Sequence, residues 1–326
     1  MKALTEVFTG LRPSGDLTIA NYLGAIKPMI DLQDKDVLIF VADLHALTDQ
    51  EAKTAAEHRK EMVVDYLALG IDPDKADIFI QSDIKDEILY LNFFLSRHIS
   101  LAEIMRVPAL KDKLKDPKHP ERASFLLAGY PIMMAADILL QAAKTVPVGE
   151  DQMSHIEVTR LLARRFNKKY GDILVEPKAQ VVKPLRVLSL TGNGKMSKSQ
   201  PNGAILLDED PKKTVAKIKK AATAVEGEMN DVLESHFVIA ESLASDDQKK
   251  QLEDIKTRNT AKEKVMGQFK VLLADIVSTF VSDFQAKKKE LLEDPDRIEQ
   301  ILAKGKQRAQ DNARQVISEI ERALKF

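Results

Sequence analysis

The order of two strands and one helix in the first 81 residues is the feature that most constrains the fold. Residues 37–42 (Val-Leu-Ile-Phe-Val-Ala) form a continuous apolar run, which is typical of a parallel strand buried on both faces. Residues 76–81 (ADIFIQ) predict a second strand. Between them lies an apolar stripe at helical spacing, closed by Gly70: Met62, Val63, Tyr66, Leu67 and Leu69. This order predicts a right-handed crossover and an open α/β sheet. Ligands of such sheets bind at the carboxyl ends of the strands, so the loops that follow strands are the candidate sites.

The sequence changes character after about residue 203, where strand patterns end. Pro211 opens a lysine-rich helix over 212–222, and from Val265 apolar residues recur at steps of three and four, as in a long amphipathic helix. Asp294 and Pro295 are typical of an N-cap and a first helical position, so they open a last helix. We therefore predict an α/β domain over residues 1–202 and an all-α domain over residues 203–326.

Composition excludes several classes of protein. The 326 residues include no cysteine, which excludes disulfides and thiolate chemistry and disfavours a zinc site. No apolar run approaches the ~20 residues of a membrane span, and the first residues lack the apolar core of a signal peptide. We therefore expect a cytoplasmic protein with no membrane partner. The net charge is −1, so a nucleic-acid partner would have to meet a local basic patch.

Two strand-to-helix turns are candidate nucleotide sites. The first covers 13–22 (PSGDLTIANY) after a short strand at 7–9, and its small and polar residues would let backbone N–H groups and a helix N-terminus face an anion. An ordinary turn capped by Thr18 fits the same residues. The second is the segment 149–152 (Gly-Glu-Asp-Gln), which follows strand residues 145–148. It fits a contact with a ribose or substrate, and equally a helix N-terminus with acids near the dipole.

The third candidate is the loop 195–199 (Lys-Met-Ser-Lys-Ser), which follows Thr-Gly-Asn-Gly at 191–194. The glycines favour a mobile loop. Two lysines three residues apart, together with two hydroxyls, can surround a polyphosphate and follow its charge as it redistributes. A generic loop of lysine and serine is more often a solvated surface segment, but this pentapeptide is specific.

KMSKS at 195–199 is the signature loop of class I aminoacyl-tRNA synthetases. Thr18-Ile19-Ala20-Asn21 resembles their other signature, HIGH, in its tryptophanyl variant TIGN, with Ala20 where that family usually has glycine. Three further segments are similar to tryptophanyl-tRNA synthetases, as is the C-terminal pattern over 269–305: YPIMMAADIL at 130–139, VPVGEDQ at 146–152 and VADLHALT at 41–48. The resemblance spans nearly the whole chain. It implies a Rossmann-like catalytic domain over 1–202 and a helical domain over 203–326 that recognises the tRNA anticodon.

The same resemblance implies a reaction and its nucleotide-binding residues. Tryptophan would be joined to the α-phosphate of ATP with release of pyrophosphate, and then transferred to tRNA(Trp). Mg²⁺ would arrive with ATP and keep several waters, with no metal site made by the protein alone. Relatives are homodimers. Catalysis is carried over to Thr18, Asn21, Lys195 and Lys198. ATP binding is carried over to a larger set: Arg12, Pro13, Ser14, Ala20, Asn21, Gly149, Glu150, Asp151, Val187, Lys195, Met196, Ser197, Lys198 and Ser199.

Asp137 is the residue to which the resemblance assigns the indole N–H. It lies in an otherwise apolar predicted helix over 132–143, where a carboxylate is costly to bury without a partner. An indole N–H only donates, which suits a fixed acceptor. Helix geometry alone favours a salt bridge to a nearby lysine or arginine, or an exposed face of the helix. The other expected pocket residues are Tyr130, Met134, His45, Gln152, Val146 and Val148, of which His45 could instead be a structural histidine.

Three other functions share parts of this pattern. A tyrosyl-tRNA synthetase has the same class motifs, but the segments around Asp137 and 149–152 resemble the tryptophanyl enzymes, and no added β domain follows the helices. A non-catalytic paralogue that binds tRNA or regulates is disfavoured by the intact Lys195, Ser197 and Lys198. A nucleotidyltransferase that makes a dinucleotide cofactor is disfavoured by the long helical part. The basic helices over 212–220 and 304–325 are either solvated faces or tRNA contacts.

Overall fold

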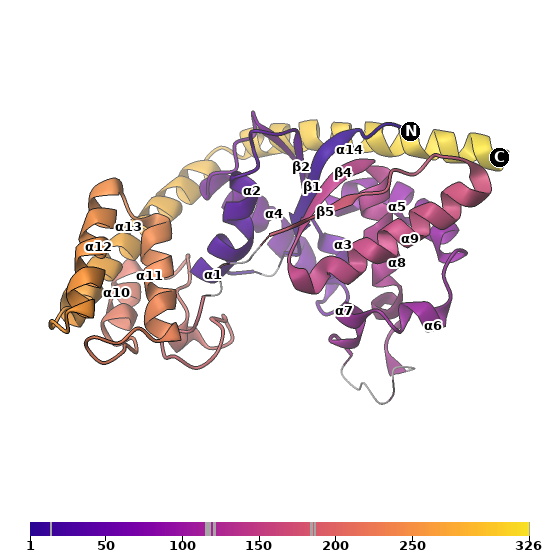
Figure 1. Cartoon of the computed structure of the whole chain (residues 1–326). Helices are drawn as coiled ribbons and strands as arrows, with labels where there is room; N and C mark the ends of the chain where they lie inside the picture. The colour runs from indigo at the N-terminus through magenta and orange to yellow at the C-terminus, as the bar shows by residue number, and fades with distance from the viewer. Residues whose placement is uncertain (14, 115–118, 120–121, 183–184, 186, 326) are drawn as a thin grey trace.

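A parallel sheet organises the first part of the chain (Figure 1). The computed structural model describes residues 1–13, 15–114, 119, 122–182, 185 and 187–325. Five strands lie in the order β3-β2-β1-β4-β5, and each neighbouring pair is parallel. The strands are β1 (Thr5–Leu11), β2 (Val37–Val41), β3 (Ala76–Ile80), β4 (Ala143–Val148) and β5 (Lys178–Val181). The predicted α/β class, with helices in the C-terminal part, is confirmed.

Alternate residues of the central strands face two separate cores, as the pleat of a strand requires. Val7, Ile39 and Ile78 lie in the core on one face, and Phe8, Leu38 and Phe79 lie in the core on the other. Helices therefore cover both faces. The longer ones are α4 (Ala52–Ala68) on the first face and α5 (Lys85–Ser96), α8 (Phe125–Leu140) and α9 (Met153–Tyr170) on the second.

Short helical turns fill the connections between the longer elements. They are α1 (Ile19–Asn21), the π-helix η1 (Tyr22–Ile26), α2 (Lys27–Ile30), α3 (Asp43–Ala46), η2 (Gln81–Ile84), α6 (Leu101–Ile104), α7 (Pro108–Lys111), η4 (Glu150–Gln152) and η5 (Pro201–Gly203).

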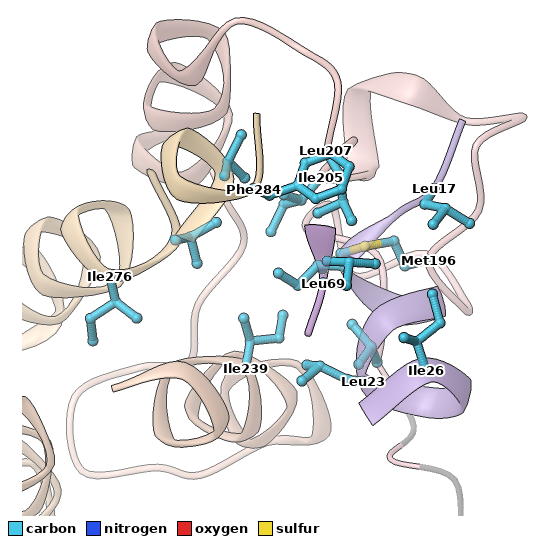
Figure 2. Close-up of a cluster of buried hydrophobic side chains, with 14 of the residues drawn as sticks. Leu17, Leu23, Ile26, Leu69, Met196, Ile205, Leu207, Ile239, Ile276 and Phe284 are labelled. Atoms are coloured by element: carbon cyan, nitrogen blue, oxygen red, sulfur yellow. The ribbon is translucent and has the colours of Figure 1, made fainter. Parts of the chain in front are cut away.

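The C-terminal part begins with four helices gathered at one end of the molecule (Figure 1). They are α10 (Pro211–Lys219), α11 (Asp231–Leu243), α12 (Asp246–Thr260) and α13 (Met266–Leu292). Their apolar faces share the core of α4 and the first sheet face, as Figure 2 shows for Leu69, Ile239 and Phe284. The Lys288 ammonium of α13 adds an ionic link, since it lies 2.8 Å from Asp65 and 3.2 Å from Glu61, both on α4.

The last helix, α14 (Pro295–Leu324), leaves this bundle and returns along the sheet. Arg308 pairs with Asp36 before β2 and Asp77 in β3, and Asn312 donates to Thr5 at the start of β1. These partners lie at the amino ends of strands, so α14 lies opposite the carboxyl ends. Gly305 permits the close approach of α14 to β3, because a Cβ at this position would lie 2.0 Å from the carbonyl oxygen of Ile78. The boundary between residues 202 and 203 stays a prediction, and α14, although it comes after that boundary, packs against the sheet.

One predicted helix is too long. The helix expected over 132–143 ends at Leu140, and Ala143 already belongs to β4. Ala142 adopts a left-handed conformation (φ 41°), which reverses the chain between helix and strand, and composition gave no sign of it. In the described part of the chain, no helix is long and apolar enough to cross a membrane.

Candidate active site

A pocket of about 390 Å³ opens at the carboxyl ends of β1, β2 and β4. This is the edge at which ligands of parallel sheets bind. The stacked rings of Phe8 and Phe40, with centroids 4.7 Å apart, form part of its apolar wall. Most predicted substrate residues line it, together with two residues predicted for ATP: His45, Tyr130, Met134, Val146, Val148, Gln152, Arg12 and Gly149.

Asp137 lies directly behind this lining, in a buried polar cluster. Its residue surface is 2% exposed, while His45 and Met134 beside it face the pocket. His45 Nε2 donates to Asp137 Oδ2 at 2.9 Å, and Gln81 Nε2 lies 2.8 Å from Oδ2 and 3.0 Å from Oδ1. Burial raises the pKa of Asp137, whereas the bonds from His45 and Gln81 act to lower it. The alternatives of a lysine or arginine partner and of an exposed helix face are therefore wrong.

Tyr130 is held by two residues that the sequence did not indicate. Its hydroxyl lies 2.8 Å from His155 Nε2, and the Lys113 ammonium lies 4.1 Å from the centroid of its ring. Burial lowers the pKa of His155 to about 4 and raises the pKa of the Tyr130 phenol. Desolvation and the nearby Arg12 lower the pKa of Lys113. Lys113 also lines the pocket, so the site has a cation that no motif marked.

The first signature segment folds as a capped turn. The Thr18 hydroxyl accepts from the backbone N–H of Asn21, and the Asn21 side chain accepts from Thr18 in return. Thr18 is 2% exposed and Asn21 is exposed. The helix-cap interpretation thus describes the geometry, and the assignment of both residues to ATP stays a prediction. Ala20 is partly buried against the core.

A π-helix follows this turn and places Gly24 and Ala25 on the pocket wall. Such segments are frequent at functional sites. On the other side of the turn, Arg12 pairs with Asp49 at 2.9 Å, and the Pro13 carbonyl accepts from Gln50. Ser14 lies outside the described residues.

The second segment continues the pocket beyond β4. Gly149 lies on the pocket wall, close to the Asp151 carboxylate. Asp151 accepts from Gln152 Nε2 at 2.7 Å. Glu150 and Asp151 are exposed, so their carboxylates are accessible at the mouth of the pocket, where the nucleoside is predicted.

The third loop is anchored by its one apolar residue. Met196 is 4% exposed, and Figure 2 shows it among Leu17, Leu69 and Ile205. Lys195, Lys198 and Ser199 are exposed, and the hydroxyls of Ser197 and Ser199 lie 2.9 Å apart. Val187 has no exposed surface, so its side chain is part of the core. Its backbone carbonyl accepts the N–H of Met196.

The first segment pairs through its backbone with residues 205–207, which follow the third loop. The N–H of Ile19 donates to the carbonyl of Ile205, and the N–H of Leu207 donates to the carbonyl of Leu17. The first segment and the third loop also share one core, because Leu17 and Ile19 of the first and Met196 of the third lie in the same hydrophobic cluster, although 176 residues separate Ile19 from Lys195 (195 − 19). Among the residues of these two loops that the structure describes, none lines the 390 Å³ pocket, which places the pocket beside them rather than between them.

Residues 2–290 match the family model of class I tRNA synthetases (W and Y). The chain belongs to this family. It is accordingly an aminoacyl-tRNA synthetase, a ligase enzyme, and the resemblance read from its motifs is confirmed.

Relatives and solved structures of class I synthetases match over almost their full length. A tryptophan–tRNA ligase of Campylobacter jejuni is 35% identical, with 97% of this chain and 98% of that protein covered. One of Halalkalibacterium halodurans is 37% identical, with coverage of 98% and 97%. The crystal structure of the Campylobacter jejuni tryptophanyl-tRNA synthetase complexed with ADP and tryptophan is similar at 32% identity and a TM-score of 0.83, with coverage of 99% and 100%.

Proposed function

We propose that this synthetase activates L-tryptophan with ATP, and that it then transfers the tryptophanyl group to tRNA(Trp). The observation that carries this proposal is the buried Asp137 carboxylate behind an apolar pocket. A fixed acceptor in apolar surroundings suits the indole, which is a large apolar ring with a single donor. The names of the relatives and of the similar structures support the same substrate.

The pocket offers complementary groups along the length of an amino acid. Met134, Val146 and Val148 present apolar walls for the ring, and their pocket has the volume typical of small-molecule sites. Tyr130, Gln152 and Lys113 provide the polar groups for the substrate ammonium and carboxylate. A substrate held with its indole toward Asp137 would direct its carboxylate toward the signature loops.

In the first reaction, a carboxylate oxygen of tryptophan attacks the α-phosphorus of ATP. A new P–O bond forms, the bond between the α-phosphorus and the bridging oxygen breaks, and pyrophosphate leaves with that electron pair. Catalysis of such a step rests on positioning and on stabilisation of phosphate charge. Lys195 and Lys198 stabilise the leaving pyrophosphate, while Thr18 and Asn21 position the phosphates. ATP enters as its Mg²⁺ complex, in which phosphates and water hold most of the ion.

In the second reaction, a terminal ribose hydroxyl of the tRNA attacks the carbonyl carbon of the adenylate. A new C–O ester bond forms, the bond between that carbon and the phosphate oxygen breaks, AMP leaves with the electron pair, and the hydroxyl proton passes to water. Residues 203–326 are the proposed reader of the anticodon, as the family resemblance implies, and single-stranded loops are read by stacking and base-edge contacts.

The functional unit is a homodimer in this proposal. Large apolar side chains are exposed on the second face of the catalytic part, where a partner subunit would cover them: Leu89 and Phe93 of α5, Leu101 of α6, and Phe125 and Leu126 of α8. Exposed apolar groups gathered in one region commonly mark an interface. Light scattering coupled to gel filtration measures the mass of the particle, and a monomer at micromolar concentration would refute this part of the proposal.

Pyrophosphate exchange into ATP with a panel of amino acids tests the function. Tryptophan should drive exchange far better than tyrosine or phenylalanine. A preference for tyrosine would overturn the proposal. Binding has an independent optical signal, because the chain contains no tryptophan and bound L-tryptophan would be the only indole in the complex. Its emission should shift to the blue on binding, as the apolar walls remove water from the ring.

A further inference from the structure

We propose that Gln81 sets the selectivity of the pocket for a substrate that carries an indole N–H, acting as a positioning residue for Asp137 and His45. This inference rests on the proposed function, since it concerns how the same site recognises its amino acid. Gln81 is the residue that follows β3, and it has no exposed surface. It does not line the pocket.

One side chain holds both members of the pair. The side-chain oxygen of Gln81, Oε1, accepts hydrogen bonds from the backbone N–H groups of Leu44 and His45 at 3.0 and 3.2 Å. Its amide nitrogen donates to the Asp137 carboxylate at 2.8 Å. Gln81 therefore joins the first turn of α3 to α8, and it fixes the backbone of His45 and the side chain of Asp137 relative to each other. His45 closes the loop, because its own Nε2 bonds Asp137 at 2.9 Å.

The count of hydrogen bonds explains how this arrangement selects a ligand. Each carboxylate oxygen can accept about two hydrogen bonds. Among the described residues, Oδ2 accepts from Gln81 and His45, whereas Oδ1 accepts only from Gln81. Capacity for one more donor therefore remains on Oδ1. A ligand with one N–H at that position completes the set, and a ligand without it leaves a buried carboxylate oxygen short of a partner, which is costly.

Gln81 contributes to this selection in two ways. Its donated bonds favour the ionised form of Asp137, which accepts and does not donate. Its accepted bonds hold the first turn of α3, so that the His45 ring stays at Oδ2 and Oδ1 keeps its remaining capacity to accept. Without Gln81 the carboxylate can rotate or take up water, and the distinction between donor and non-donor ligands should weaken.

The test compares tryptophan with its benzothienyl analogue, in which sulfur replaces the indole N–H. Both amino acids are assayed by pyrophosphate exchange, and the measured quantity is the ratio of their kcat/KM values. Loss of one buried hydrogen bond corresponds to roughly 5- to 150-fold in that ratio. We expect Gln81→Met to reduce the preference for tryptophan by at least fivefold, mainly through KM, while kcat for tryptophan changes little.

A matched variant separates this role from a merely structural one. Gln141→Met also removes a buried glutamine without exposed surface, but Gln141 bonds Ala309 and Asn312 of α14, at the amino ends of the strands and away from the pocket. It should lower the melting temperature comparably and leave the preference unchanged. In an Asp137→Ala background, Gln81→Met should alter the preference less than twofold, because residues that act through one another are not additive.

The outcomes distinguish this inference from the proposed function. If Gln81→Met keeps the wild-type preference, or if Gln141→Met reduces it equally, the role of Gln81 is refuted while the synthetase function stands. If its effect multiplies with that of Asp137→Ala, Gln81 acts independently and the inference also falls. Absence of exchange with tryptophan in the wild-type protein would instead refute the proposed function.

Discussion

The two ends of the candidate site differ in how far they are built before a ligand arrives. At the closed end, Asp137, Gln81 and His45 are at most 5% exposed and hydrogen-bond one another across three elements. At the open end, Lys195 and Lys198 project from an exposed loop in which only Met196 reaches the core.

This difference indicates when the side chains at each end lose conformational entropy: during folding at the closed end, and during ligand binding at the open end. The closed end is ordered on folding, so it can discriminate between amino acids with little further loss of entropy. The open end can follow a phosphate group whose charge changes during the reaction, and its strongest contacts can form in the transition state. Changes at the closed end should therefore alter selection, and changes at the open end should alter turnover.

The largest effect is expected at the open end. Lys195→Ala and Lys198→Ala should each lower kcat by roughly 30- to 1000-fold, equivalent to about 2–4 kcal/mol, which is typical for loss of one preorganised charge-stabilising donor. The KM for tryptophan should change little, because the lysines act on the pyrophosphate. Steady-state pyrophosphate exchange measures both constants.

Lys35→Ala provides a control for charge alone, since Lys35 is exposed just before β2, at the amino ends of the strands. It should leave both constants unchanged. A Lys195→Ala variant with normal kcat and a raised KM for tryptophan would reverse the assignment of the two ends.

The next largest effect is expected at the closed end. Asp137→Ala removes the acceptor and leaves the Gln81 amide and the His45 ring without their partner, a loss of about 1–3 kcal/mol. We expect kcat/KM for tryptophan to fall roughly 5- to 150-fold and the rejection of phenylalanine to weaken, because polar recognition discriminates better than an apolar pocket. Competition between the two amino acids in the exchange assay measures this, and unchanged selectivity would remove Asp137 from the site.

The same contrast explains what sequence could predict. β2, β3 and the crossover helix follow from local periodicity, which depends on neighbouring residues. The signature loop was found as a motif, because its residues are contiguous. Asp137 was found through a resemblance and through its apolar neighbours, but its partners His45 and Gln81 are 92 and 56 residues away.

Gln81, His155 and Lys113 were missed for the same physical reason. Each acts through a contact between elements that are distant in sequence, and no spacing encodes such a contact. Gln81 could have been found with the rule that residues after a parallel strand approach the site, since it ends the predicted strand segment 76–81. His155 and Lys113 follow no strand directly and carry no such signal.

A third effect concerns the pH dependence of stability in the two halves. His155 behind the pocket and His236 in the bundle are both buried, and burial, with Lys113 near the first and Lys270 near the second, lowers each pKa to about 4. Histidine in the unfolded chain titrates near 6.5. Between these values the unfolded chain binds more protons, so the free energy of unfolding falls as the pH falls from about 7 to about 4.

Each histidine should contribute up to about 1.4 kcal/mol per pH unit to that fall. Urea unfolding at several pH values measures the slope. His155→Gln and His236→Gln should each flatten it relative to the wild type, whereas Lys195→Ala should leave it unaltered, since the exposed loop contains no such group. Equal slopes in all four proteins would show that neither histidine is kept neutral by burial.

The smallest effect on the catalytic centre is expected from the basic helix that follows the open loop. Lys212, Lys213 and Lys219 are exposed on α10, and Lys220 is exposed at its C-cap. Replacing them in pairs by glutamate should raise the KM for tRNA, and the slope of log kcat/KM against log salt should decrease by about 0.7–0.9 for each phosphate group that is no longer neutralised. Lys249→Glu with Lys250→Glu is the matched control on α12, where these lysines pair with Asp246 and Asp247.

Exchange of pyrophosphate decides to which region α10 belongs. The helix is tied to the segment that follows the signature loop, because Lys217 bonds Glu209 and the carbonyl of Ala204. If α10 serves only the tRNA, the paired replacements leave exchange unaltered and change charging alone. If pyrophosphate exchange falls as much as aminoacylation of the tRNA, the lysines of α10 influence the phosphates of ATP through that segment. The open end of the site then extends from the loop into the helical bundle.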